Sequence, residues 1–229
     1  METFYTFFVS IVKLISTFVA MEILGKENEL LMACTALFMK YGVKSLTMND
    51  IASHLGVSKK TIYLYVSDKK DLVNKAVRLH IKNEECLITS LCCVDKENAI
   101  DELLDINQKM SEKLQSIQPA VMYDLQKFYP EAWKIIEDHK TCFVSTIVKE
   151  NIEKGIKEGL YRENVNPVII SNLYVVMVNK IFDTDLFPHM GFDYRTLHLE
   201  MTRYHIRGIA SRKGIEYLKE KLAQTNQEF

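Results

Sequence analysis

Helix-breaking residues are scarce in this 229-residue chain, which has only 8 Gly and 4 Pro. Few stretches alternate apolar and polar residues in the way that half-buried strands do. The composition, 48% hydrophobic and 26% charged, is that of an ordinary soluble protein and excludes disordered and collagen-like classes. We therefore predict an all-α fold.

The sequence also lacks the residue spacings that carry catalysis or bind metals. No CxxC pair, HxxxH pair or ExxH pair is present, and neither a triad spacing nor a phosphate-cradling glycine loop occurs. We predict that the chain is not an enzyme, holds no metal and needs no cofactor. An odd number of scattered cysteines fits reduced thiols in a cytoplasm, with a thiol sensor at Cys92-Cys93 as the alternative. These cysteines are Cys34, Cys86, Cys92, Cys93 and Cys142.

The net charge of the chain is close to zero, −1, but the charged residues are unevenly distributed along the sequence. Residues 40–82 contain nine Lys/Arg and three Asp, a net charge of +6, and the remainder carries −7. A basic module on an acidic body suits phosphate contact, because each neutralised phosphate releases condensed counterions. The alternative is a solvated basic surface without a partner.

The N-terminus has an apolar run, Phe4 to Ala20, with Lys13 near its middle. It is short for a membrane span, and Glu2 stands where a signal peptide has positive charge. We treat residues 1–21 as a hydrophobic extension and favour a translation start at Met21. An extra helix and a membrane anchor over residues 4–20 are the alternatives.

A run of short helices is predicted after this extension. The first covers residues 26–41 with an apolar stripe that includes Cys34 and Phe38, and Gly42 ends it. Thr47 is the expected N-cap of a helix over Met48–Leu55, with Asp50 as its acidic partner. Two such helices joined by a glycine turn are typical of a helix-turn-helix.

The next helix is predicted over residues 59–66. Gly56 breaks the preceding helix, Val57 should point inward, Ser58 should cap the new helix, and Ser67 should cap a fourth one. With Ile62 and Val66 buried, its remaining side chains face outward, where such a helix enters the major groove. Lysines there can reach guanine or phosphate, threonine can offer a hydroxyl or methyl, and tyrosines can bond phosphates. These side chains are Lys59, Lys60, Thr61, Tyr63 and Tyr65, and Lys69 is expected to contact the backbone at the next helix start.

The stretch Phe38–Leu72, with Gly42, the Thr61-Ile62-Tyr63 core and Lys69-x-x-Leu72, resembles the N-terminal domain of TetR-family (TetR/AcrR-type) regulators. Many members have Tyr-x-His/Tyr-Phe where this chain has Tyr63-Leu64-Tyr65-Val66, a mild departure. Weaker resemblance extends over residues 25–222, through Asp124–Trp133, Gly155–Arg162 and Gly208–Leu218.

The resemblance implies a homodimer whose two recognition helices read a palindromic operator in double-stranded DNA. Carried over by position, the residues at the DNA would be Thr47, Met48, Asn49, Lys59, Lys60, Thr61, Tyr63, Tyr65 and Lys69. It also implies a helix-turn-helix domain over residues 22–80. A larger helical domain over 81–229 would bind an effector and form the dimer.

This larger domain is predicted to contain helices at about 96–116, 119–128, 130–158, 167–186 and 194–223, three of which begin at a proline. Apolar stripes on the last two suggest a dimer interface, with intramolecular core as the alternative. Its candidate residues are Leu173, Met177, Ile181, Met201 and Tyr204. Adaptable and aromatic side chains are candidates for a pocket. They are Met110, Met122, Tyr123, Gln126, Trp133, His139, Phe143 and Met177.

The preferred function is a cytoplasmic repressor that a small apolar or aromatic effector releases from DNA, without a membrane partner. One alternative keeps the DNA binding and drops the effector. Another makes the chain a membrane-tethered regulator through residues 4–20. A helical enzyme has almost no support.

Overall fold

The computed structural model of the chain describes residues 25–93, 98–182 and 191–225. Helices account for most of these ranges, in which the only β pairing is an isolated bridge between Tyr161 and Ala210. The all-α prediction is therefore confirmed. Within the same ranges, no helix has the length and apolar character needed to cross a membrane. The hydrophobic run Phe4–Ala20 lies outside the described residues.

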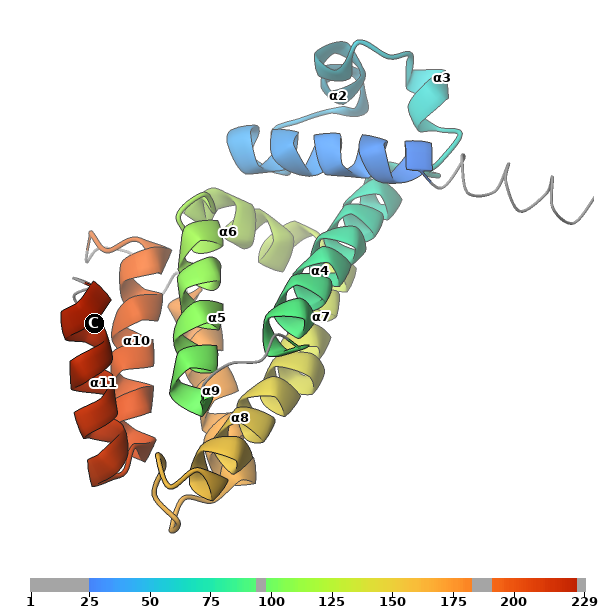
Figure 1. The fold of residues 1–229 in the computed structure, drawn as a ribbon. Helices are drawn as coiled ribbons and strands as arrows, with labels where there is room; N and C mark the ends of the chain where they lie inside the picture. The colour runs from blue at the N-terminus through green and yellow to red at the C-terminus, as the bar shows by residue number, and fades with distance from the viewer. Residues whose placement is uncertain (1–24, 94–97, 183–190, 226–229) are drawn as a thin grey trace, which may run out of the picture. The chain divides into compact units, whose positions relative to one another are not determined.

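The chain divides into two compact units, with the division between His80 and Ile81 (Figure 1). The N-terminal unit contains a helix over residues 25–41, α2 (Met48–Leu55), α3 (Lys59–Ile62) and the start of α4 (Lys69–Cys93). α4 continues into the C-terminal unit, so one helix contributes residues to both. The predicted stripe of the first helix is buried at Leu31, Cys34 and Phe38.

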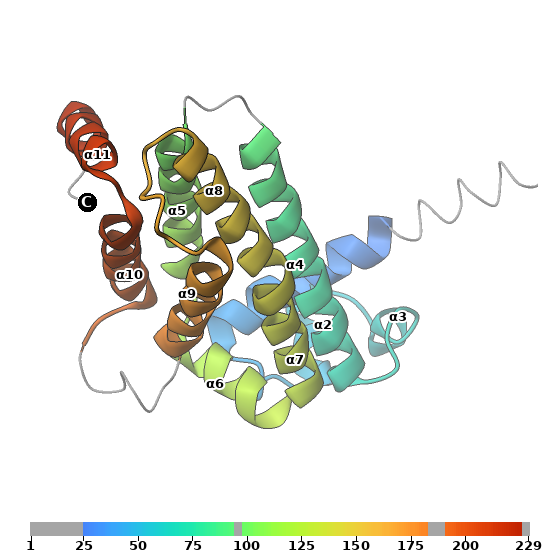
Figure 2. The same cartoon turned by 90° about the horizontal axis from the view of Figure 1, so that it is seen from below.

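The C-terminal unit is a helical bundle. In chain order it contains the rest of α4, then α5 (Ala99–Leu114), α6 (Pro119–Phe128), α7 (Pro130–His139), the π-helix η1 (Lys140–Val144), α8 (Ser145–Lys157), α9 (Pro167–Ile181), α10 (Tyr194–Ile209) and α11 (Arg212–Thr225). α8 packs on α9, α5 packs on both α8 and α10, and α9 packs on α10 (Figure 2). Pro119, Pro130 and Pro167 open their helices as predicted, since the first turn needs no proline N–H.

The predicted single helix over 194–223 is wrong. α10 ends at Ile209 because Ala210 adopts an extended conformation, φ −63° and ψ 141°, and pairs with the segment after α8. The Arg162 amide donates to the Ile209 carbonyl at 2.9 Å, and the Ser211 amide donates to the Leu160 carbonyl at 2.8 Å. This pairing between distant segments overrides the local helical preference, and α11 begins afresh at Arg212.

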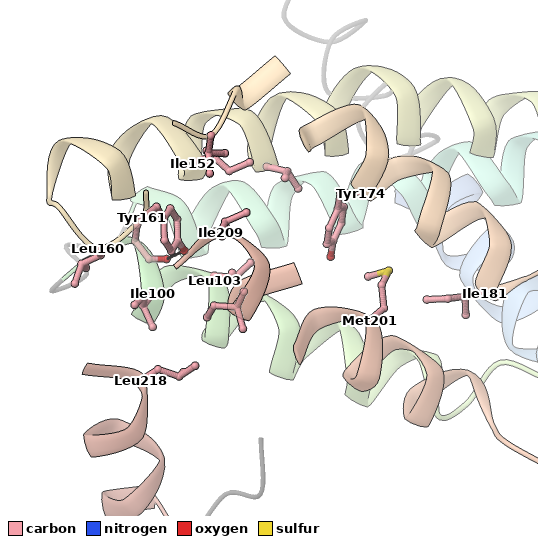
Figure 3. Close-up of a cluster of buried hydrophobic side chains, with 14 of the residues drawn as sticks. Ile100, Leu103, Ile152, Leu160, Tyr161, Tyr174, Ile181, Met201, Ile209 and Leu218 are labelled. Atoms are coloured by element: carbon pink, nitrogen blue, oxygen red, sulfur yellow. Dashed lines mark hydrogen bonds between the residues drawn. The ribbon is translucent and has the colours of Figure 1, made fainter. Parts of the chain in front are cut away.

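One apolar core holds the C-terminal unit together. It joins Ile100 and Leu103 of α5, Ile152 of α8 and Tyr174 of α9 with side chains of α10 and α11 (Figure 3). Removal of this apolar surface from water is the main force that stabilises the bundle.

Candidate DNA interface and effector region

Thr47 fixes the start of α2. Its hydroxyl accepts a hydrogen bond from the Asp50 amide at 3.2 Å, and an Asp50 carboxylate oxygen accepts from the Thr47 amide at 2.8 Å. The Thr47 hydroxyl also donates to this carboxylate, and these bonds lower the pKa of Asp50. The result is a reciprocal capping box that satisfies two helix-start amides, so the predicted cap is confirmed.

The turn between α2 and α3 depends on Gly56. Its φ of 65° lies in the left-handed region, which an L side chain rarely adopts, and its amide donates to the Ser53 carbonyl at 3.2 Å. The Val57 amide donates to the Ala52 carbonyl, but the Val57 side chain is exposed. The prediction that Val57 points inward is therefore wrong.

α3 is shorter than the predicted helix over 59–66. It spans Lys59–Ile62 and continues as turns, in which the amides of Tyr65 and Val66 both donate to the Ile62 carbonyl. Ser58 caps it as predicted, because its hydroxyl accepts from the Thr61 amide at 3.0 Å. Ile62 and Val66 are buried, as expected. The opposite side of α3 and of the turn after it therefore faces the solvent.

The structure places most predicted DNA contacts on the surface. Thr47, Asn49, Lys59, Lys60 and Tyr63 are exposed, and the Lys59 ammonium lies 6.0 Å from the centre of the Tyr63 ring. Thr61, Tyr65 and Lys69 are half-buried.

Met48 is a correction among the predicted DNA contacts. Its side chain is buried beside Ile51 and Ala52 on the inner face of α2, so it is a core residue that a base edge cannot reach.

The start of α4 also differs from prediction. Asp68, not Ser67, caps this helix, since an Asp68 carboxylate oxygen accepts from the Asp71 amide at 2.8 Å. The Ser67 amide donates instead to the Asp71 carboxylate at 2.8 Å. The Lys69 ammonium donates to the Lys44 carbonyl at 3.3 Å and so braces the segment before α2.

Leu64 was missed by the sequence reasoning. It follows α3 and its side chain is 70% exposed, which is unusual for a leucine. The available signal was the four-residue spacing of Ile62 and Val66, which puts position 64 on the opposite side of the turn. An exposed leucine there can contact a thymine methyl group.

The candidate pocket residues do not form one group. Tyr123 and Gln126 lie on the exposed side of α6, where they cannot line an interior cavity, and this corrects the prediction for both. The Lys127 ammonium instead donates to the Tyr123 hydroxyl at the surface. Met122 belongs to the core cluster, Trp133 and Met177 pack against it, and Met110 is half-buried.

His139 and Phe143 come together at the end of α7, with stacked rings 5.4 Å apart. His139 is buried between two carboxylates of α4: its Nδ1 lies 3.0 Å from Glu85 Oε1 and its Nε2 lies 3.3 Å from Glu84 Oε1. Burial alone would lower the pKa of His139, but the two hydrogen bonds outweigh it and raise this pKa. Both ring nitrogens donate to carboxylates only in the imidazolium form.

Lys140, the next residue, was not among the candidates. It opens η1 and is 6% exposed, and its ammonium lies 4.6 Å from the Phe182 ring centre and 5.5 Å from that of Trp133. Burial lowers the pKa of Lys140 to about 8, although Glu137 and Glu84 act in the opposite direction. No sequence pattern shows this burial of Lys140.

The predicted dimer residues divide in two. Ile181 and Met201 are buried in the core cluster, so they offer no surface to a partner, and their assignment to an interface is wrong. Leu173 and Tyr204 are exposed, and Met177 is half-buried. One side of α9 carries further exposed aliphatic side chains. We call it the α9 face, and it consists of Ile169, Leu173 and Val176.

Among the described residues, no group of three or more His, Cys, Asp or Glu side chains could hold a metal ion.

A capped α2, a glycine turn and a short basic α3 with its outer side in solvent together define a helix-turn-helix DNA-binding unit. The class of the protein is therefore that of the helix-turn-helix transcriptional regulators.

Comparison with known proteins shows which family the N-terminal unit is similar to. Residues 30–76 match the family described as "Bacterial regulatory proteins, tetR family". The chain is 23% identical over 144 residues to YvaF of Bacillus subtilis (strain 168), an uncharacterized HTH-type transcriptional regulator, and this match covers 62% of the chain and 73% of the relative. These matches support a TetR-family transcriptional regulator, and the proteins of this family are not enzymes.

Solved structures share the fold. A transcriptional regulator from Cytophaga hutchinsonii ATCC 33406 superposes with a TM-score of 0.67 at 20% identity, over 82% of this chain and all of that one (100%). A transcriptional regulator from Saccharomonospora viridis, solved in complex with choline, superposes with a TM-score of 0.62 at 16% identity, over 82% of this chain and 99% of that one.

Proposed function

We propose that this TetR-family regulator is a homodimeric cytoplasmic repressor that a small apolar or aromatic effector releases from a palindromic operator. In this proposal residues 22–80 read the DNA and residues 81–229 bind the effector and form the dimer. The observation that carries the DNA-binding part is the outer side of α3. There Lys59, Lys60 and Tyr63 are exposed while Ile62 anchors the helix to the core.

The chemistry of this surface suits duplex DNA. Two adjacent lysines supply positive charge for phosphates or guanine acceptors, and the Tyr63 hydroxyl can bond a phosphate oxygen. α3 is only four residues long, so few side chains can reach base edges. Sequence discrimination by one copy is correspondingly limited, and a second copy on a second half-site multiplies it.

The α9 face supports the dimer. Its three side chains recur at helical spacing on the side of α9 opposite the buried Tyr174 and Ile181, and each is more than half exposed. A contiguous aliphatic surface of this kind is costly in water and is typical of an interface between subunits. A second copy of the same face would cover it in an isologous contact.

The effector is supported by the buried groups around α7. His139 is buried in the C-terminal unit, and Trp133 and Phe143 are half-buried aromatic side chains, of which Phe143 stacks on His139. The choline-bound neighbour has a similar fold with a small molecule in its structure. Since α4 contributes residues to both units, an effector that moves α4 can change the geometry of the dimer.

Binding to the DNA upstream of the chain's own gene tests the proposal. Lys59→Ala should weaken binding in a gel shift and reduce the slope of log affinity against log salt by about 0.9, the value for one lost phosphate contact. Tyr63→Phe should weaken binding by loss of one hydrogen bond. Lys219→Ala, at an exposed position of α11, is the control and should bind as the unchanged protein does.

If neither Lys59→Ala nor Tyr63→Phe alters the gel shift, the assignment of α3 as the recognition helix is wrong. A thermal-shift screen with hydrophobic ligands tests the effector separately. Failure of every ligand to stabilise the protein would favour a regulator that binds DNA without an effector.

A further inference from the structure

Lys140 presents an ammonium group that the fold buries without a hydrogen-bond acceptor. Across the part of the chain that the structure describes, its Nζ atom has no hydrogen-bond partner. An ammonium has three N–H donors, and in water all three are satisfied. A buried charge without such partners is costly. Proteins keep a charge of this kind mainly where another group, such as a bound ligand, supplies the missing hydrogen-bond acceptors.

The aromatic rings beside Lys140 compensate for only part of this loss. The faces of Phe182 and Trp133 attract the ammonium through their quadrupoles, at 4.6 Å and 5.5 Å. Neither ring supplies a lone pair. The pKa of Lys140, lowered to about 8, shows that the surroundings still disfavour the charged form.

The backbone at Lys140 is also unusual. The helix widens there into a π-helix, η1, whose first residue is Lys140. Such single π turns inside α-helices are frequent at functional sites, because the extra residue in the turn re-aims a side chain. The unpaired ammonium and the π turn are thus two independent features at one residue.

We propose that Lys140 binds the carboxylate of a small organic monoanion whose apolar or aromatic body packs against Trp133 and Phe182. This inference rests on the proposed effector-responsive function and specifies the chemical class of the effector. It adds one carboxylate to the apolar or aromatic effector of that proposal.

The charges around the site favour a single negative charge. Glu84 and Glu137 are the acidic groups that act on Lys140, and Glu84 also bonds His139. These carboxylates would repel a dianionic phosphate more strongly than a monoanionic carboxylate, and the single ammonium can balance only one negative charge of the ligand. The ring of Phe182 packs against that of Tyr194, 4.9 Å away, so the aromatic group beside Lys140 is itself held in the core.

The chain provides its own probe for this site. Trp133 is the single tryptophan of the sequence, so its fluorescence reports binding beside Lys140. We would titrate the full-length protein with octanoate, benzoate and 1-naphthylacetate, each paired with its neutral primary amide. The readouts are Trp133 fluorescence for the octanoate pair and thermal shift for all three pairs.

At least one carboxylate should bind at least tenfold more tightly than its amide. Lys140→Met, which keeps the length of the side chain, should reduce that carboxylate's affinity to the level of the amide. Lys134→Met, which removes an exposed lysine of α7, should leave the preference unchanged. The ratio measured on the unchanged protein does not depend on whether Lys140→Met folds.

Equal affinity within every pair, or no binding by any carboxylate, would overturn the inference, as would a carboxylate preference that survives Lys140→Met in a folded protein. DNA binding, measured in parallel, tests the proposed function independently of the anion site. If amides bind as well as carboxylates and both release DNA, the effector-responsive function stands and the anion site is wrong. If the carboxylate binds through Lys140 without affecting DNA, the site stands and effector-controlled release is wrong.

Discussion

The ring of Tyr161 lies against the backbone of Gly155, so closely that a Cβ atom on Gly155 would be 2.1 Å from Tyr161 Cδ2. Tyr161 is fully buried, and its hydroxyl donates to Asn151 Oδ1 at 3.1 Å. The amides of Leu160 and Tyr161 both donate to the Gly155 carbonyl. The Gly155–Arg162 stretch therefore folds as one unit, in which the glycine makes room for the tyrosine ring.

Gly155→Ala should destabilise the C-terminal unit by about 1–3 kcal/mol, the usual cost of overpacking a filled core. Urea unfolding followed by Trp133 fluorescence measures this cost. Gly208→Ala is the matched control, because Gly208 also lies in a helix but has no atom within 4 Å of an added Cβ. This control should be neutral or more stable by up to about 1 kcal/mol. Equal effects of the two substitutions would contradict the packing argument.

His139 should make the stability of the C-terminal unit depend on pH. Its pKa is raised in the folded state by the hydrogen bonds to Glu84 and Glu85, which exceed the effect of burial. A raised pKa means that the stabilisation is fully present below the unfolded pKa, about 6.5, and is lost as pH rises through the folded pKa. The stability advantage over His139→Phe should therefore be larger at about pH 6 than at about pH 8.5.

Urea unfolding of both proteins at the two pH values measures this difference. Replacement of both carboxylates, in Glu84→Gln/Glu85→Gln, removes the partners and should remove the same part of the pH dependence. Comparison with variants is needed because burial lowers the pKa of His198 and of His205 to about 4, which destabilises the fold on acidification. Parallel stability curves for the unchanged protein and His139→Phe would show that the imidazolium is not stabilised.

The helix-turn-helix could be predicted from sequence because its signals are local. Thr47, Gly56 and Ser58 each act on amides or dihedral angles within a few residues, and the structure has the two predicted side-chain caps and a positive φ at Gly56. Position 48 could not be predicted in this way, since the first residue of a helix can face either the core or the solvent.

The C-terminal unit was predictable only as a set of helices. The end of α10 at Ile209 depends on hydrogen bonds to Leu160 and Arg162, about fifty residues away in the sequence. Ile181 and Met201 occur in apolar stripes that fit a subunit interface and a core equally well, and only packing shows that they are core. The burial of Lys140 and the two partners of His139 likewise depend on tertiary contacts.

The α9 face should be needed for association of two copies. Leu173→Glu and Val176→Glu each place a carboxylate in an aliphatic contact, where an unpaired buried charge costs several kcal/mol. We expect dimerisation to weaken at least about 100-fold, which corresponds to roughly 2.7 kcal/mol. Size-exclusion chromatography with light scattering measures the mass. Gln126→Glu adds the same charge at an exposed position of α6 and should leave the mass unchanged. A dimer that survives both α9 substitutions would exclude this face as the interface.

The cap at Ser58 should couple stability to DNA binding. α3 has only four residues, so the hydrogen bond from the Thr61 amide to the Ser58 hydroxyl is a large part of what holds it. Ser58→Ala should cost about 1 kcal/mol, as the loss of an N-cap commonly does. It should also weaken DNA binding, because Lys59 and Lys60 then lie on a frayed turn. Thermal unfolding by circular dichroism and fluorescence anisotropy on labelled DNA measure the two effects.

Ser53→Ala, at an exposed position of α2, is the control and should be neutral or slightly stabilising, since alanine is the better helix former. Full DNA affinity in Ser58→Ala would mean that the DNA itself orders α3, whatever caps the helix.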